Sequence, residues 1–169
     1  TIFVGDTSVN EYPSSEELAE IAISAARVVK LFGFIPKVAF VSHSTFGQPL
    51  TSRTKHIRDA VEILQDKRVD FQFDGDMQPD VALNEEYKEL YSFSGIVGNA
   101  NILIMPGQHS AAISYKMMKS LGDTKVIGPL LIGLGQPIEI APLRSSTSEI
   151  INLASVAAYS ADVIDYKKN

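Results

Sequence analysis

An arginine and three hydroxyl side chains stand together just before a long apolar periodic segment near the end of the sequence. They are Arg144, Ser145, Ser146 and Thr147. The N-terminus of a helix presents free backbone N–H groups and a positive dipole, so these residues are suited to binding a phosphate or another anion. Ser146 and Glu149 also match the capping box of an ordinary helix start, with Arg144 then only an exposed side chain. The residue types alone leave both interpretations open.

A second group of polar residues is acidic. Asp74, Asp76, Asp80 and Glu85 recur at offsets that resemble a calcium-binding loop, but Pro79 stands where that loop needs glycine. We therefore predict no metal site here. The simpler interpretation is a strand end that turns through a glycine, with Asp74 bonding to amides of its own loop.

Two histidines and a glycine pair are further candidates. His43 and His109 both fall beside the ends of predicted strands, so they could line one cleft, although such histidines are more often solvent-facing. The pair in residues 133–135 lacks the third glycine of a dinucleotide-binding fingerprint and precedes a proline. No Gly-x-Ser-x-Gly elbow, Walker loop or metal-binding histidine pair occurs. These patterns assign no catalytic residue.

The elements that must position these residues alternate between strand and helix. Apolar periodicity predicts helices over about 14–33, 51–64, 85–91, 109–121 and from 147 onward, and strands near 1–4, 37–42, 69–73, 101–105, 126–127, 130–132 and 137–140. Ser14 and Glu17 form a capping box at the first helix, and Gly33 ends it. In the last helix, Ile150, Ile151 and the following alanines are expected to pack inward. The alternation predicts a single layered α/β/α domain over residues 1–169, with a largely parallel sheet.

Composition narrows the class of partner. The 20 acidic and 15 basic residues give a net charge of −5 with no basic block, so we expect no nucleic-acid partner. No apolar run reaches the roughly 18 to 20 residues of a membrane helix, so we expect no membrane association and a cytoplasmic location. The absence of cysteine rules out disulfides, a thiol nucleophile and thiolate zinc sites. Because the sequence starts at Thr1 and runs directly into an apolar stretch, we expect it to be part of a longer chain.

Four stretches in fixed order resemble the phosphate acetyl/butyryltransferase family: residues 3–10, 42–47, 74–78 and 127–137. The resemblance extends over nearly the whole chain. It implies a lobe like those of isocitrate and isopropylmalate dehydrogenases, forming the second half of a phosphate acetyltransferase-type domain. In that family, acyl-CoA or acyl phosphate binds in a cleft between two lobes.

The sequence departs from this family where the family's chemistry resides. Active members carry a Ser-Arg-Gly-Cys-Ser stretch before the last helix and an aspartate at its start, which helps to deprotonate the thiol of CoA. Here Arg144 matches the arginine, but Leu143 stands at the serine position and Ile150 at the aspartate position. Phe46 replaces a lysine, and residues 107–112 replace an acidic, asparagine-bearing stretch. Because isoleucine accepts no proton, the resemblance implies a domain without catalytic residues.

Residues 42–47, 80–84 and 106–110 are more similar to a subgroup of the family, the C-terminal domain of hybrid NADP-dependent malic enzymes. The resemblance implies that the domain senses acetyl-CoA and forms a homodimer through this lobe. It implies no cofactor in the domain itself, with NADP and a divalent metal bound in upstream domains of the same chain. Two alternatives stay open: an active phosphate acyltransferase in which His43 or His109 substitutes as base, and a purely structural dimerisation module.

The same resemblance predicts which residues meet the ligand. Those expected to bind the acyl-CoA or its phosphates are Arg144, Ser145, Ser146, Thr147, Ser44, Thr45, Gly133 and Gly135. Those expected to be structural or to line the cleft are Asp74, Gln78, Pro129, His43 and His109.

Overall fold

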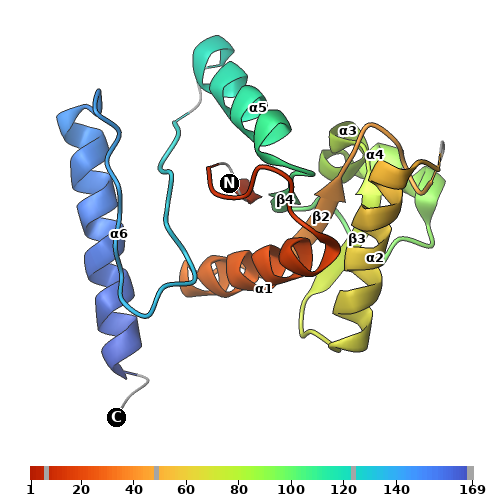
Figure 1. Ribbon diagram of the computed structural model, residues 1–169, viewed down its shortest axis with the longest axis horizontal. Coiled ribbons are helices and arrows are strands. Elements are labelled where there is room, and N and C mark those ends of the chain that lie inside the picture. Colours follow the sequence, from red (N-terminus) through yellow and green to blue (C-terminus); the bar gives the residue numbers. More distant parts are fainter. Residues whose placement is uncertain (6–7, 48–49, 123–124, 167–169) are drawn as a thin grey trace. The chain divides into compact units, whose positions relative to one another are not determined.

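The computed structural model describes residues 1–5, 8–47, 50–122 and 125–166. It divides into two compact units, Thr1–Tyr115 and Lys116–Asn169, which are described separately below. Figure 1 shows both units and labels most of their helices and strands. Among the described residues, no helix is both long enough and apolar enough to span a membrane.

The first unit is built on a four-stranded sheet in which every pairing is parallel. Its strands are β1 (Phe3–Gly5), β2 (Lys37–Val41), β3 (Gln72–Met77) and β4 (Ile102–Ile104), in the spatial order β1-β4-β2-β3. The central strand β2 pairs with β3 on one side and β4 on the other, and Val38–Val41 are almost completely buried. A near-continuous apolar strand is typical of a parallel sheet covered on both faces. The predicted α/β class is confirmed.

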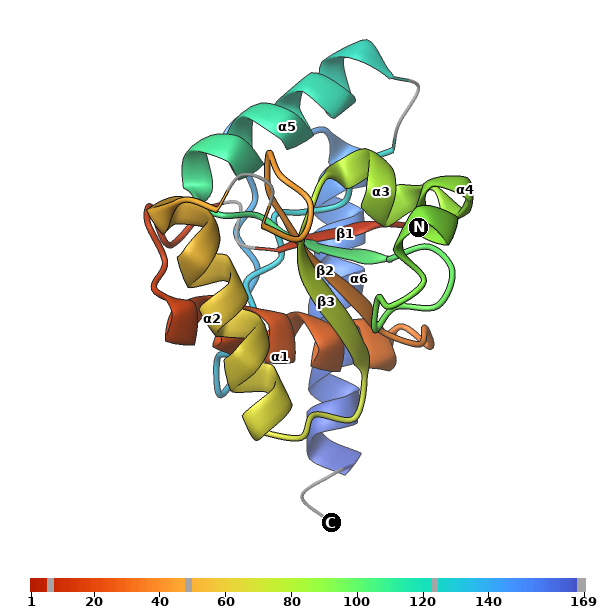
Figure 2. The same ribbon diagram turned by 90° about the vertical axis from the view of Figure 1, so that its right-hand side faces the viewer.

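Helices cover both faces of this sheet (Figure 2). On one face lie α1 (Ser15–Leu31) and α2 (Ser52–Asp66). On the other, Ala39 and Val41 of β2 join an apolar cluster that includes Val81 of α3 (Pro79–Leu83) and Ala111 in the first turns of α5 (Gln108–Leu121). A short helix α4 (Glu85–Lys88) and a 3-10 turn η1 (Glu89–Tyr91) follow α3.

Local signals place the ends of α1 where the sequence predicts them. The Glu17 amide donates to Ser14 Oγ over 3.2 Å, and the Ser14 amide donates to Glu17 Oε2 over 2.7 Å. Gly33, with a φ of 82°, follows the helix in the left-handed conformation that glycine favours. At α2, Thr51 is the cap rather than Ser52.

Strand β3 differs from the prediction for residues 69–73. It begins at Gln72, opposite Lys37, and continues through Gly75 to Met77, opposite Val41. At Gly75 the chain passes so close to β2 that a Cβ would lie 2.7 Å from the Phe40 carbonyl oxygen. Glycine therefore permits the strand to continue here instead of ending it.

The second unit contains the end of α5 and helix α6 (Thr147–Tyr166), and the described residues between them, 125–146, form no helix or strand. The strands predicted at 126–127, 130–132 and 137–140 are wrong, because the described residues of this segment pair with no neighbouring strand. Instead, the Leu131 amide donates to Glu139 Oε2 over 3.1 Å and closes the segment on itself. Partial burial raises the pKa of the Glu139 carboxyl, and this hydrogen bond offsets part of the rise.

The start of α6 carries the capping box that the sequence predicts. Ser146 N donates to Glu149 Oε2 over 2.8 Å, and Glu149 N donates to Ser146 Oγ over 3.3 Å. Lys119 of α5 also donates to Glu149 Oε1 over 2.8 Å. The Lys119 ammonium first, and then the Ser146 donors, lower the pKa of Glu149 to about 2. The prediction that Ile150 and Ile151 pack inward is wrong in this unit, where they are 49% and 58% exposed and Leu153 is the buried residue.

We expect replacement of Lys119 by methionine to raise the pKa of Glu149 towards its ordinary value of 4.5. Since the folded pKa lies below the unfolded one, this ion pair stabilises the fold above about pH 4.5, and the contribution is lost as the pH falls towards 2. A carbon-13 NMR titration of the Glu149 carboxyl measures the change. Lys116→Met, on the same helix, is the control and should leave the titration unaltered. An unchanged Glu149 pKa in Lys119→Met contradicts the assignment.

Candidate functional site

The carboxyl ends of the parallel strands meet at one edge of the sheet in the first unit, where α/β proteins commonly bind ligands. The loop after β2 brings His43, Ser44 and Thr45 to this edge. Gln78 follows β3 directly, and His109 lies in the first turn of α5, shortly after β4. The topology therefore gathers five of the predicted site residues at one edge.

A buried carboxylate anchors the loop after β2. Asp76 is completely buried in β3, and the Ser44 hydroxyl donates a short hydrogen bond to its Oδ2. The Gly47 amide donates to Asp76 Oδ1 over 3.1 Å, and the Phe46 amide donates to the Asp76 carbonyl over 2.7 Å. Sequence reasoning treated Asp76 only as part of an acidic cluster. No periodic signal marks it, because its partners are about thirty residues away in the sequence.

Gln78 makes a second set of bonds to the same loop. Its Nε2 donates to the His43 carbonyl over 2.8 Å, and its amide donates to Thr45 Oγ1 over 3.2 Å. Ser44 itself is buried, and the Thr45 hydroxyl accepts the hydrogen bond from the Gln78 amide. The His43 and His109 side chains are exposed to solvent, in line with the simpler interpretation of both. The His43 ring meets Ser42 Oγ, 3.5 Å from Nδ1, which is a weak contact.

Asp74 does not lie at this edge but in the middle of β3. Its carboxylate accepts hydrogen bonds from Gly75 N over 2.9 Å and from Gly95 N over 2.7 Å. Gly75 is a local partner of the kind that the sequence predicts, whereas Gly95 lies 21 residues further along the chain, so the prediction of a strand end bonded only to its own loop is wrong. Within the described residues, no group of three or more histidine, aspartate or glutamate side chains is arranged to hold a metal ion.

The remaining predicted residues belong to the second unit. At the start of α6 the capping box occupies Ser146, whereas Arg144 is exposed and forms no ion pair with a described residue. Ser145 N donates to the Pro142 carbonyl over 3.0 Å, and its Oγ is shielded from solvent without a hydrogen-bond partner among the described residues. An arginine and a hydroxyl without a partner, both next to a helix start, can donate hydrogen bonds to a bound anion.

Gly133 and Gly135 are exposed, and apart from the adjoining residues no described atom lies within 4 Å of where a Cβ would stand at either position. Gly133 has a φ of 84°, so a side chain there would strain the backbone whatever the space. Pro129 is half-buried in the same segment. The predicted cleft residues are therefore divided between the two units. Each group is ordered locally, the first by Asp76 and Gln78 and the second by the cap of α6.

The comparisons with known proteins agree with these features. Residues 1–158 match the family described as phosphate acetyl/butaryl transferase. An NADP-dependent malic enzyme from Rhizobium meliloti is 49% identical over 161 residues, which is 95% of this chain and 21% of that protein. A phosphate acetyltransferase from Clostridium acetobutylicum is 35% identical over 162 residues, or 95% of this chain and 49% of that protein.

Solved structures show the same fold. A phosphotransacetylase from Streptococcus pyogenes superposes with a TM-score of 0.88 at 34% identity, covering 94% of this chain and 49% of that one. The chain thus spans about a fifth of the malic enzyme and about half of the transferases. With the match extending over residues 1–158 and the parallel sheet in common, the chain belongs to the phosphate acetyl/butaryl transferase family.

Proposed function

We propose that this chain is the non-catalytic, acetyl-CoA-sensing and oligomerising domain of a cytoplasmic NADP-dependent malic enzyme. The observation that carries the proposal is the 49% identity to such an enzyme over 95% of the chain, with apolar residues at two positions that active transferases use. Oxidative decarboxylation of malate, NADP and a divalent metal would belong to domains upstream of this sequence.

The ligand would meet the start of α6. Arg144 is exposed and free to pair with a phosphate of acetyl-CoA, with the unpartnered Ser145 hydroxyl beside it. Ser146 and Thr147 would contribute through backbone amides at the positive helix end, since the Ser146 side chain is engaged with Glu149. The exposed backbone at Gly133 and Gly135 leaves room for a bulky ligand.

Local chemistry at this helix start argues against acyl transfer. Leu143 and Ile150 are exposed, and the family resemblance places these apolar residues where active relatives carry a serine and an aspartate. The carboxylate in the first turn is Glu149, whose pKa of about 2 makes it a weak base for a thiol. A domain that senses a ligand without catalysis must bind it with different affinities in two states of the enzyme. A ligand with equal affinity for both states would not change their relative populations.

We expect full-length enzyme to show malate kinetics that change when acetyl-CoA is added. Arg144→Ala should weaken acetyl-CoA binding by about 1.5 to 3 kcal/mol, the value of a charge-assisted hydrogen bond. Calorimetry on the full-length protein measures the affinity, and Arg27→Ala, an exposed arginine of α1, is the control. Identical malate kinetics with and without acetyl-CoA would count against sensing, and equal affinity in Arg144→Ala would count against the site.

An active phosphate acetyltransferase is the second candidate, favoured by the 35% identity to the Clostridium acetobutylicum enzyme. In this case Arg144 would hold the acyl phosphate, and His43 or His109 would replace the missing base. We expect no thioester formation from acetyl phosphate and CoA above background in a coupled assay of the full-length protein. Turnover well above background, lost in Arg144→Ala, would establish the transferase instead.

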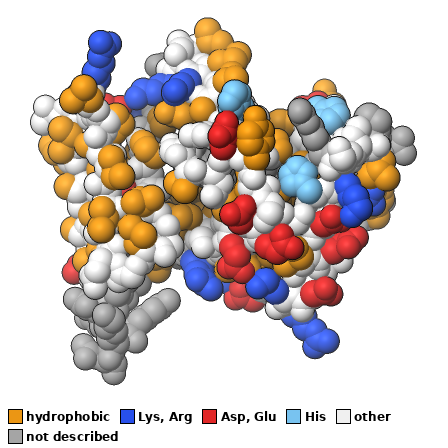
Figure 3. All heavy atoms as spheres, viewed as in Figure 1, with side chains coloured by type: hydrophobic (Ala, Val, Ile, Leu, Met, Phe, Trp, Pro, Cys, Tyr) orange, Lys and Arg blue, Asp and Glu red, His pale blue; other side chains and the backbone are white. Residues whose placement is uncertain are grey.

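We also expect this chain to form a homodimer, because the second unit leaves large apolar side chains in solvent. Met117, Leu121, Ile151 and Tyr159 are each more than 40% exposed, and Figure 3 shows hydrophobic side chains spread over α6 and the segment before it. Symmetric dimers are the commonest assembly. Light scattering should give twice the 18.4 kDa mass of one chain. A monomer at high concentration would contradict dimerisation through this chain.

A further inference from the structure

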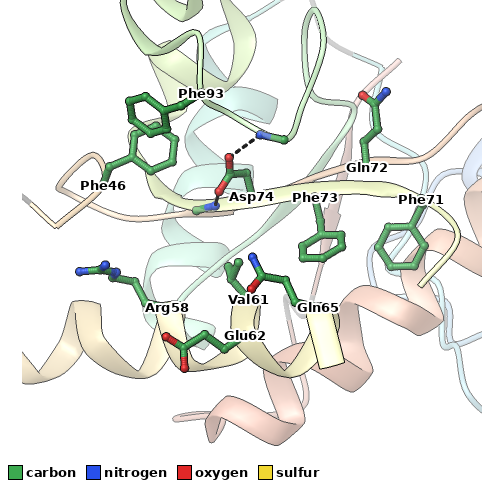
Figure 4. Close-up of a pocket in the computed structure, with 12 residues that line it drawn as sticks. Phe46, Arg58, Val61, Glu62, Gln65, Phe71, Gln72, Phe73, Asp74 and Phe93 are labelled. Carbon is green, nitrogen blue, oxygen red and sulfur yellow. Dashed lines mark hydrogen bonds between the residues drawn. The ribbon is translucent and has the colours of Figure 1, made fainter. Parts of the chain in front are cut away.

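An open groove lies in the first unit between α2 and the edge strand β3 (Figure 4). Its volume is about 760 Å³, within the range of small-molecule sites. The groove is remote in the sequence from the α6 start and is independent of the acetyl-CoA site proposed there. Arg58, Glu62 and Gln65 of α2 form one wall, while Phe73 of β3 and Phe93 contribute to the other.

The α2 wall presents three different polar groups in order along one face of the helix. Positions 58, 62 and 65 are spaced by four and three residues, so their side chains share a face, and the first and last stand about 10 Å apart along the axis. All three are exposed, and their side chains form no hydrogen bond or salt bridge with a described residue. A cation, a carboxylate and an amide therefore follow one another along the groove.

The Arg58 guanidinium lies at one end of the groove, where Gly47 of the opposite loop has no side chain and leaves room for it. A Cβ at Gly47 would lie 2.8 Å from Arg58 Nη1, so the guanidinium lies directly over a residue that has no side chain. The amide of Gly47 is itself fixed to Asp76, which holds this loop in position. Beside it, Phe46 and Phe93 meet edge to face with ring centroids 4.8 Å apart.

The other end of the groove is aromatic and uncharged. Phe71 and Phe73 meet edge to face there, with centroids 6.0 Å apart, and the Gln65 side chain lies between Val61 and Phe73 on the same side of the groove (Figure 4). An aromatic face together with an amide suits a heteroaromatic base, because the ring stacks and the amide can pair with its edge. Glu62, between the two ends, can accept hydrogen bonds from sugar hydroxyls, as acidic residues do in nucleotide sites.

We infer that this groove binds a purine nucleoside monophosphate, with its phosphate on Arg58, its ribose beside Glu62 and its base between Gln65 and Phe73. The distance along α2 matches the extended length of such a ligand. A single phosphate is favoured over a polyphosphate because Glu62 and Asp74 place two carboxylates near the middle of the groove, where further phosphates would be repelled. Arg58 is the one cation that lines the groove among the described residues.

Calorimetric titration of the chain with adenosine monophosphate tests this inference, with adenosine, inorganic phosphate and adenosine triphosphate as comparison probes. We expect saturable binding of the monophosphate that Arg58→Gln weakens about 10-fold or more, as the loss of a charge-assisted bond should. Gln65→Ala should weaken adenosine and the monophosphate alike, and Arg58→Gln should leave adenosine binding unchanged. Arg27→Gln on α1 is the matched control and should bind like the unaltered chain.

Each contrary result overturns a stated part of the inference. No saturable binding of the monophosphate to the unaltered chain overturns the site itself. Loss of binding in Arg144→Gln rather than Arg58→Gln moves the nucleotide to the α6 start. Inorganic phosphate or adenosine triphosphate binding as tightly as the monophosphate removes the assignment of ligand class. Arg58 and Gln65 are exposed, and unchanged circular dichroism and melting temperature would show that their variants remain folded.

Discussion

The buried carboxylate of Asp76 determines the geometry of both candidate sites in the first unit. A carboxylate away from water is costly unless it is hydrogen-bonded, and here the Ser44 hydroxyl and the Gly47 amide supply the bonds. The loop after β2 therefore has one favoured conformation. This conformation exposes His43 at the sheet edge, places Phe46 beside Phe93, and opens the space over Gly47 that Arg58 occupies. A change at Asp76 would disturb all of these features together.

The second unit also has a carboxylate held by hydrogen bonds, but this one is at the surface rather than buried. At the start of α6, the Glu149 carboxylate accepts hydrogen bonds from Lys119 and Ser146. The capping box and the anion-site interpretation, which looked like alternatives, are compatible in this geometry. The cap uses Ser146 and Glu149, while Arg144 and the Ser145 hydroxyl stay unused by the described residues. A helix start can be capped internally and still offer a cation to a ligand.

Sequence reasoning succeeded where the signal and its partner lie close together. The capping box of α1 joins Ser14 to Glu17, and the helix end at Gly33 depends on one residue's backbone freedom. Sequence reasoning failed where the local structure depends on a residue that is distant in the sequence. The residues from 126 to 140 have strand-forming composition, but a strand exists only beside another strand. The anchoring of Ser44 by Asp76 spans 32 positions and left no periodic trace in the sequence.

Membership of a transferase family does not by itself determine whether this chain transfers acyl groups, because the fold is a frame on which a few side chains decide the chemistry. The frame is preserved, as the TM-score of 0.88 against a phosphotransacetylase shows. Catalysis would require a group with a pKa near the working pH beside the thiol. At the α6 start, Ile150 has no titratable group and Glu149 is held at a pKa of about 2 by Lys119 and Ser146. The interactions that stabilise this helix start are thus the same ones that make its carboxylate a poor base.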